Sequence, residues 1–252
     1  MIPFSKTMRM PDFQELEPEL ALVDKVLWML NGGDKAQHPM RRWEYAMAVK
    51  AYTHWTGNKY GYMSEKKSII SDHGCCTGML APLMFYLGND VRMYEVWSWG
   101  NQEALALQQM EMVKAHAVGG GSYQMIHRPL GHMIEEDKGV DVAFCISTME
   151  HIPPYELAFR QMCQTVNPGG MLFMTTDSAE DEHDHYIANN VRAGTMFNAT
   201  VYQRLAAWGE EEGFKLMNET SDWSWDEGCR MLPTPTSGLA GYGFACMAME
   251  RK

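Results

Sequence analysis

The sequence predicts one α/β domain built on a mostly parallel β-sheet, and three observations lead to this prediction. From Lys67 onward, short apolar segments, turns and amphipathic segments follow one another repeatedly, which is typical of parallel strands covered by helices. The 252 residues suffice for one such domain with a large core. Hydrophobic residues make up 46% and charged residues 21%, as in ordinary globular proteins.

Residues 1–60 are expected to form a helical cap that belongs to the same domain as residues 61–252. Residues 15–30 carry apolar side chains at helical spacing and end at Asn31-Gly32-Gly33, a strong signal for a helix C-terminus. A second helix is expected from Pro39 or Met40 to about Thr56.

The remainder of the chain is predicted to alternate between strands and helices. The strands are expected at residues 67–71, 90–95, 123–127, 140–147 and 171–176. The helices are expected at residues 79–87, 102–117, 154–166 and 199–212. Two further strands, at 214–223 and 242–249, have no long helix between them and predict an antiparallel hairpin at one sheet edge. The expected fold is therefore a Rossmann-like, seven-stranded sheet that is mostly parallel.

Charge and hydropathy exclude several classes of function. The 21 Lys and Arg against 32 Asp and Glu give a net charge of -11, which repels phosphate backbones and disfavours nucleic acid as a partner. Asp24 and Lys25 interrupt the longest apolar stretch, so no membrane span is expected. No secretory signal is visible at the N-terminus, which favours a cytoplasmic location. The six cysteines lack the spacing of zinc ligands, and neither disulfides nor a metal is expected.

A glycine-containing turn at residues 71–78 joins the first predicted strand to a helix. Such a turn lets the backbone approach a ligand closely, and a carboxylate-bearing ligand suits the helix N-terminus, although tight packing alone is the alternative. Glu95 ends the next strand about twenty residues later, where a carboxylate can accept hydrogen bonds from both hydroxyls of a ribose. A solvated carboxylate is the alternative for Glu95. The two features together predict a nucleotide-like ligand.

Three segments resemble the motifs of class I S-adenosylmethionine-dependent methyltransferases, in that family's order and spacing. Residues 70–78, Ile-Ser-Asp-His-Gly-Cys-Cys-Thr-Gly, resemble the first motif. Residues 141–152 resemble the fourth-strand motif, and residues 167–172, Asn-Pro-Gly-Gly-Met-Leu, resemble the turn into the fifth strand. The resemblance covers residues 67–177 and, more loosely, the tail. It implies S-adenosyl-L-methionine as methyl donor and S-adenosyl-L-homocysteine as product.

The resemblance also implies which residues surround the donor's methionine moiety. Asp72, Gly74 and Gly78 would shape that pocket, and Ser147 would line the donor site. Cys76 stands where the family has its middle glycine, so a side chain occupies space that usually belongs to the ligand or to a backbone with positive φ. We expect Cys76 either to weaken donor binding or to tilt the donor.

The nucleoside part of the donor is expected to follow the next two strands. The resemblance implies that Glu95 holds the ribose and that His127 and Arg128 flank the adenine. An NAD-dependent enzyme would share the glycine turn and the acidic strand end, and it is the nearest enzymatic alternative. The two later motifs favour the methyltransferase.

Histidines beyond the later strands are the candidates for catalysis. Methyl transfer to a hydroxyl requires an aligned nucleophile that loses its proton, usually to histidine. His151 is the best placed, because ligands of open α/β sheets bind beyond the carboxyl ends of strands; ordering of its loop or contact with the donor are the alternatives. His183 and His185 lie in an acidic segment, residues 177–186, for which a solvated loop or a metal site with Asp181 are alternatives.

The leading hypothesis is an O-methyltransferase that needs no metal and acts on a small polar or glycan-type acceptor. Residues 41–45, Arg-Arg-Trp-Glu-Tyr, resemble a stretch of some methyltransferases of glycan pathways, although packing of Trp43 and Tyr45 in an amphipathic helix also explains the two aromatic residues. A donor-binding protein without transferase activity, suggested by Cys76, is one alternative. Methylation of a protein or nucleic acid is the other.

Overall fold

The computed structural model describes most of the chain. The described residues are 5–9, 12–30, 39–57, 67–96, 101–117, 119–179, 183–187, 191–217, 221–224 and 243–252. The strands are β1 (Lys6–Thr7), β2 (Ile69–His73), β3 (Asp90–Glu95), β4 (Tyr123–His127), β5 (Val140–Ile146), β6 (Val166–Ser178), β7 (His183–Ile187), β8 (Val191–Met196), β9 (Phe214–Leu216) and β10 (Gly243–Arg251).

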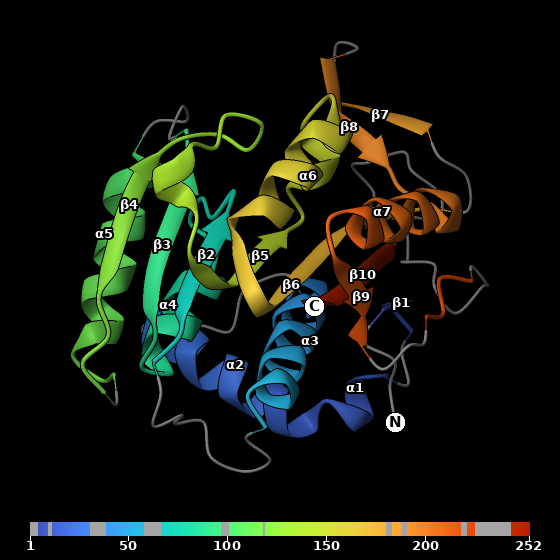
Figure 1. The fold of residues 1–252 in the computed structure, drawn as a ribbon. Coiled ribbons are helices and arrows are strands. Elements are labelled where there is room, and N and C mark those ends of the chain that lie inside the picture. The colour runs from blue at the N-terminus through green and yellow to red at the C-terminus, as the bar shows by residue number, and fades with distance from the viewer. Residues whose placement is uncertain are drawn as a thin grey trace.

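An eight-stranded sheet forms the centre of the molecule (Figure 1). Its strand order is β1-β10-β6-β5-β2-β3-β4, and β9 also pairs with β10. The run from β6 to β4 is parallel, whereas β10 is antiparallel to its neighbours β6, β1 and β9. The strand order reverses direction at β2, because the chain continues from β2 outward to β3 and β4 before it returns to β5. Strands β7 and β8 form a separate antiparallel pair.

Helices cover both faces of this sheet. They are α1 (Asp12–Glu15), α2 (Glu17–Leu30), α3 (Pro39–Trp55), α4 (Leu80–Tyr86), α5 (Gln102–Lys114), α6 (Tyr155–Thr165) and α7 (Ala199–Glu211), with 3₁₀ turns η1 (Glu135–Asp137) and η2 (Met149–His151). Buried residues of α2 to α5 share one hydrophobic cluster, and those of α6 and α7 share a second. The N-terminal helices therefore pack on the same face as α4 and α5.

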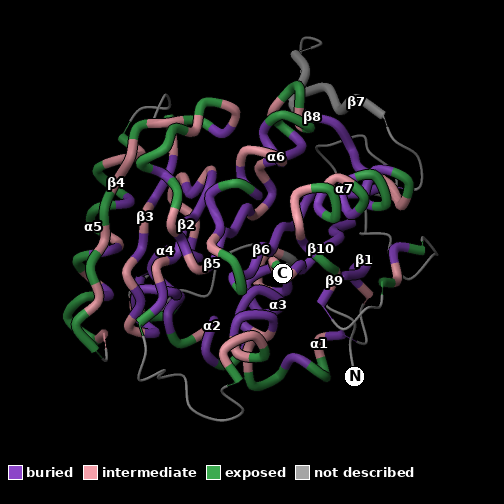
Figure 2. Tube along the Cα trace, viewed as in Figure 1, coloured by how far each residue is buried: buried purple, intermediate pink, exposed green. Residues whose placement is uncertain are grey.

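The central strands are buried on both sides, as Figure 2 shows. Val142 and Phe144 of β5 point into the core beneath α2 to α5, whereas Ala143 and Cys145 point into the core beneath α6 and α7. The same alternation continues along β6 and β10. Near-continuous apolar runs are the pattern expected of parallel strands between two helical layers.

The structure confirms the predicted parallel sheet, its covering helices and the antiparallel C-terminal strands. Strands β3 and β4 have the predicted bounds, and most other predicted elements shift by a few residues at their ends. The strand predicted at residues 214–223 is much shorter, because β9 ends at Leu216. Among the helices that the structure describes, none is long and apolar enough to cross a membrane.

Two further features differ from the prediction. The sheet has an eighth strand, β1, and the antiparallel β10 lies inside the sheet between β6 and β1, so it does not form an edge hairpin with β9 alone. The expectation of a loop over residues 177–186 is wrong at both ends, because β6 continues to Ser178 by pairing with β10, and β7 begins at His183. A two-residue strand carries no alternation that a sequence could reveal, and the pairing of β6 comes from a strand more than 60 residues away.

Candidate functional site

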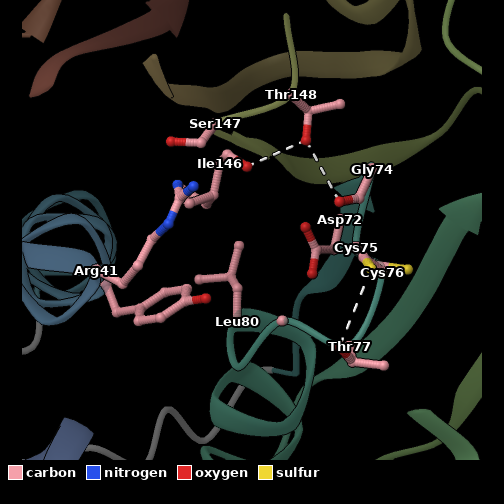
Figure 3. Close-up of a pocket in the computed structure, with 12 residues that line it drawn as sticks. Arg41, Asp72, Gly74, Cys75, Cys76, Thr77, Leu80, Ile146, Ser147 and Thr148 are labelled. Atoms are coloured by element: carbon pink, nitrogen blue, oxygen red, sulfur yellow. Dashed lines mark hydrogen bonds between the residues drawn. The ribbon is translucent and has the colours of Figure 1, made fainter. Parts of the chain in front are cut away.

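A pocket of about 230 Å³ opens where the strand order reverses, at the carboxyl ends of β2 and β5. Ligands of open α/β sheets bind at this kind of position. Figure 3 shows the turn after β2 on one side of the pocket, the turn after β5 above it, and α3 on the other side. The lining residues are Arg41, Tyr45, Asp72, Gly74, Cys75, Cys76, Thr77, Gly78, Leu80, Ile146, Ser147 and Thr148.

The turn after β2 requires glycine at position 74. Its φ is +73°, in the left-handed region, and the backbone N–H of Gly74 donates to the carbonyl of Tyr94 at 2.8 Å. A Cβ at this position would lie 2.1 Å from Cγ2 of Thr148, which belongs to the turn after β5. Gly74 thus allows the two turns that enclose the pocket to touch one another.

Cys76 adopts the left-handed backbone that the replaced glycine would favour. Its φ is +44°, a conformation that costs a residue with a Cβ about 1–2 kcal/mol. The side chain is partly buried and lines the pocket, with Sγ 4.0 Å from Oγ1 of Thr77. The cysteine is therefore accommodated with backbone strain at the edge of the site.

Asp72 of β2 lines one side of the pocket with a buried carboxyl group. Its side chain is 2% exposed, and burial raises its pKa to about 7; the nearby charge of Glu95 also raises this pKa, and a hydrogen bond from the backbone N–H of Ala81 opposes the rise. A carboxyl group that titrates near neutral pH can attract a cationic ligand group once it ionises.

Helix α3 supplies site residues that the sequence analysis did not assign. Arg41 reaches from α3 into the pocket toward Ser147, and its Nη1 donates to Oε2 of the buried Glu44 at 2.9 Å (Figure 3). Oγ of Ser147 donates to Oε1 of Glu44 at 2.6 Å. Tyr45, which was expected to pack in the helix, is buried; its hydroxyl also lines the pocket and accepts from the backbone N–H of Met79.

The sequence contains one signal that would have identified these residues. Arg41 and Glu44 are three residues apart in a predicted helix, beside Trp43 and the apolar residues 46–49. Charged residues beside such an apolar stretch indicate a helix face turned toward a polar site in the interior.

The pocket brings together five of the residues predicted for the donor site, namely Asp72, Gly74, Cys76, Gly78 and Ser147. Glu95 lies outside it at the end of β3, where its carboxylate accepts from the backbone N–H of Val96 at 2.8 Å. Its charge raises the pKa of both Asp72 and Cys75, which places it beside the same turn. A ligand that extends from the pocket across β3 would reach Glu95.

The two residues predicted for adenine contacts have protein partners one strand further out. Nε2 of His127, at the end of β4, lies 3.1 Å from Oε1 of Glu103 on α5. Arg128 forms a close ion pair with the buried Asp137. Neither residue lines the pocket.

Two acidic side chains, Glu150 of η2 and Asp177 near the end of β6, lie close to Arg41, which lines the pocket. Glu150 is 3% exposed, and its Oε1 accepts from the backbone N–H of Asp177 at 3.0 Å, while Oε2 has no hydrogen-bond partner among the described residues. Burial raises the pKa of Asp177, and the charges of Arg41 and His151 oppose this rise, so Asp177 lies near both. His151 itself is exposed at the end of η2.

The remaining candidates for catalysis are His183 and His185, whose backbone belongs to β7. Their side chains lie outside the described part of the structure, as does Asp181.

Comparison with known proteins identifies the family. A family described as a methyltransferase domain matches residues 58–219, which is more than half of the chain. The chain belongs to this methyltransferase family. The resemblance seen in the sequence motifs is thereby confirmed, and the pocket lies between two of those motifs.

Curated relatives of this methyltransferase include enzymes named ubiquinone biosynthesis O-methyltransferase. The protein of Acinetobacter baumannii strain ACICU is 31% identical over 124 residues, 48% of each chain. The protein of Colwellia psychrerythraea is 25% identical over 169 residues, 64% of this chain and 63% of its own. The methyltransferase thus spans about half to two thirds of the length of these relatives.

Solved structures share the fold over nearly the whole chain. The 1,6-didemethyltoxoflavin-N1-methyltransferase of Burkholderia thailandensis, with bound 1,6-didemethyltoxoflavin and S-adenosylhomocysteine, has a TM-score of 0.55 at 14% identity and covers 94% of this chain and 89% of its own. The N-methyltransferase NodS of Bradyrhizobium japonicum, in complex with S-adenosylhomocysteine, has a TM-score of 0.54 at 11% identity and covers 95% of this chain and 97% of its own. The predicted Rossmann-like fold is confirmed.

Proposed function

We propose that this protein transfers a methyl group from S-adenosylmethionine to a hydroxyl of a small polar, glycan-type acceptor in the cytoplasm. The observation that carries the donor assignment is the pair of opposite charges in the pocket, with Arg41 on α3 and Asp72 on β2. The methionine moiety of the donor bears a carboxylate and an ammonium group. Arg41 would bind the carboxylate, and ionised Asp72 would attract the ammonium.

The nucleoside would extend from this pocket across the carboxyl ends of β3 and β4. Glu95 would accept hydrogen bonds from the ribose hydroxyls, as its position beside the turn allows. The adenine would then lie near His127 and Arg128. S-adenosylhomocysteine bound in solved structures of the same fold supports S-adenosylmethionine as the donor.

The acceptor would approach from the side of η2 and β6. O-methylation of a small molecule is supported by the names of the curated relatives, and a glycan-type acceptor by residues 41–45. The acceptor oxygen would attack the methyl carbon while the bond from carbon to sulfur breaks and its electrons remain on sulfur. The hydroxyl proton would pass to the imidazole of His151, with Glu150 and Asp177 as hydrogen-bond acceptors for a polar substrate.

Calorimetric titration tests the donor. The protein should bind S-adenosylmethionine and S-adenosylhomocysteine with micromolar affinity and should not prefer NAD. Glu95→Ala should weaken this binding about tenfold or more, because the two ribose hydroxyls lose a charged acceptor. Glu210→Ala removes an exposed carboxylate from α7, on the other face of the sheet, and should leave the affinity unchanged. An absence of donor binding, or a preference for NAD, would overturn the proposal.

His151→Ala tests the acceptor side of the reaction. With a hydroxyl acceptor found by screening sugars and phenols, kcat should fall about 10²- to 10⁴-fold while the affinity for S-adenosylhomocysteine stays unchanged. His132→Ala, which alters another exposed histidine, is the control. Unchanged turnover in His151→Ala would remove its assigned role, and donor binding without turnover on any acceptor would favour a donor-binding protein.

A further inference from the structure

A fully buried carboxylate connects helix α3 to the ends of two central strands. Glu44 of α3 is 0% exposed, and its two oxygens have different partners. Oε1 accepts from the hydroxyl of Ser147, in the turn after β5, and from the hydroxyl of Thr175 in β6. Oε2 accepts from Nη1 of Arg41 at 2.9 Å. One side chain thus contacts three elements around the pocket.

Packing alone does not explain a glutamate at this position. Moving a carboxylate from water into the protein interior costs several kcal/mol, and partners recover this cost only when the geometry is good. Burial raises the pKa of Glu44, whereas Arg41 and the two hydroxyls oppose that rise. An apolar residue would pack α3 against the sheet without the cost of desolvation, so the carboxylate must serve the placement of its partners.

The most constrained of these partners is Ser147. Its φ of +44° is a strained conformation for a residue with a Cβ. The backbone N–H of Ser147 donates to the carbonyl of Thr175 at 3.0 Å, and its hydroxyl donates to Glu44 at 2.6 Å. The next residue, Thr148, packs directly against Gly74. The hydrogen bond to Glu44 therefore stabilises the turn that forms the upper wall of the pocket.

We propose that Glu44 is a positioning residue of the donor site, which holds the guanidinium of Arg41 and the turn at Ser147 in place around the methionine moiety. This inference rests on the proposed function, because the ligand is taken to be S-adenosylmethionine. Glu44 contacts no ligand in this arrangement. It acts through Arg41 and Ser147, and it makes the docking of α3 and the binding of donor mutually dependent.

Glu44→Gln separates the two sets of contacts. The amide oxygen can still accept from Ser147 and Thr175, but the amide nitrogen then faces the guanidinium of Arg41 and cannot pair with it. We expect the dissociation constant for S-adenosylhomocysteine to rise roughly tenfold or more, as for the loss of a charged hydrogen bond. The affinity for adenosine, which lacks the carboxylate and the ammonium, should stay within about twofold of the wild type.

Two threonines offer a matched pair of variants. Thr175→Val removes the hydroxyl that donates to Glu44, and it should also weaken the binding of S-adenosylhomocysteine more than the binding of adenosine. Thr176→Val removes an equally buried hydroxyl from the next residue, which bonds to Tyr202 on the opposite face, so it should lower stability without changing donor affinity. Thermal unfolding of each variant separates loss of stability from loss of binding.

The results distinguish this inference from the proposed function. Failure of the wild-type protein to bind S-adenosylhomocysteine would remove both. Normal donor binding by the wild type, with unchanged affinity in Glu44→Gln and Thr175→Val, would overturn only the role of Glu44. An equal loss of affinity for S-adenosylhomocysteine and adenosine would show that Glu44 only stabilises the fold, and so would an equal loss of donor affinity in Thr176→Val. Either result would also overturn the positioning role of Glu44.

Discussion

Gly74→Ala is expected to abolish donor binding and to lower the free energy of unfolding by about 2–4 kcal/mol. Two costs add at this position. The added Cβ disfavours the φ of +73°, and it would lie 2.1 Å from Cγ2 and 2.4 Å from Oγ1 of Thr148. Relief of this overlap would move the turn after β5 away from the turn after β2, and both line the pocket. Calorimetry with S-adenosylhomocysteine and urea unfolding measure the two effects.

Gly57→Ala is the matched control for this substitution. Gly57 has a φ of +71°, nearly the same as Gly74, but a Cβ there would meet no atom within 4 Å. It should therefore cost only the conformational strain, about 1 kcal/mol, and leave donor binding intact. Addition of Thr148→Ala to Gly74→Ala should recover part of the lost stability, because it removes the two nearest atoms. Wild-type donor affinity in Gly74→Ala would show that contact between the turns does not shape the site.

Donor affinity is expected to increase as the pH rises through about 7, because Asp72 must ionise to attract the donor's ammonium group. The pKa of Asp72 is raised to about 7, chiefly by burial, with Glu95 adding to the rise. Below that pH the association constant should fall by up to about tenfold per pH unit. Asp72→Asn should bind more weakly and show a flat profile between pH 5 and 8, whereas adenosine should show no such dependence on pH. A steep profile retained in Asp72→Asn would assign the titration to another group.

The same carboxyl group should make the protein less stable as the pH rises from about 4 to 7. Over that range the folded state keeps a proton that the unfolded state releases, so the free energy of unfolding falls by up to about 1.4 kcal/mol per pH unit. Asp72→Asn should remove this component. Urea unfolding of the wild type and the variant at several pH values measures the difference, which should increase up to pH 7 and then stay constant.

The neighbouring His73 should make stability change with pH in the opposite direction, which provides a control. Burial lowers the pKa of this histidine to about 3; its ring stacks on Tyr94 with centroids 4.8 Å apart, and both ring nitrogens lack hydrogen-bond partners among the described residues. The unfolded state therefore binds the extra proton between about pH 3 and 6.5, and stability rises with pH over this window. His73→Phe keeps the stacking and should remove the rise in stability with pH. The free energy of unfolding of the variant should therefore exceed that of the wild type most at acid pH.

Local sequence patterns predicted most of the fold because they reflect contacts within each element. Strands β3 and β4 are only six and five residues long, and the bounds of both were predicted correctly. Strand β1 and the pairing of β6 with β10 were missed or misplaced, because those strands form against partners far along the chain. A strand that exists only through such pairing leaves little trace in its own residues.

The candidate site divides in the same way. Asp72 at the end of β2 and the two glycines of the turn that follows it, Gly74 and Gly78, lie in one short segment, and the φ of +73° at Gly74 is a backbone requirement that glycine meets. Arg41 and Glu44 precede this turn by about thirty residues, and the residues next to them in the sequence do not indicate which strand ends they contact.

The sequence by itself determined the order of the parallel strands and their helices, the glycine turn and the family, because these depend on periodicity and on the φ angles that each residue type allows. Only the tertiary structure decided that α3 forms a wall of the pocket. Glu44 is 103 residues from Ser147 and 131 residues from Thr175 along the chain. Their hydrogen bonds form only once burial of the apolar residues of α3 has brought this helix against the sheet. A carboxylate that is removed from water there must hydrogen-bond to the polar groups that lie within reach.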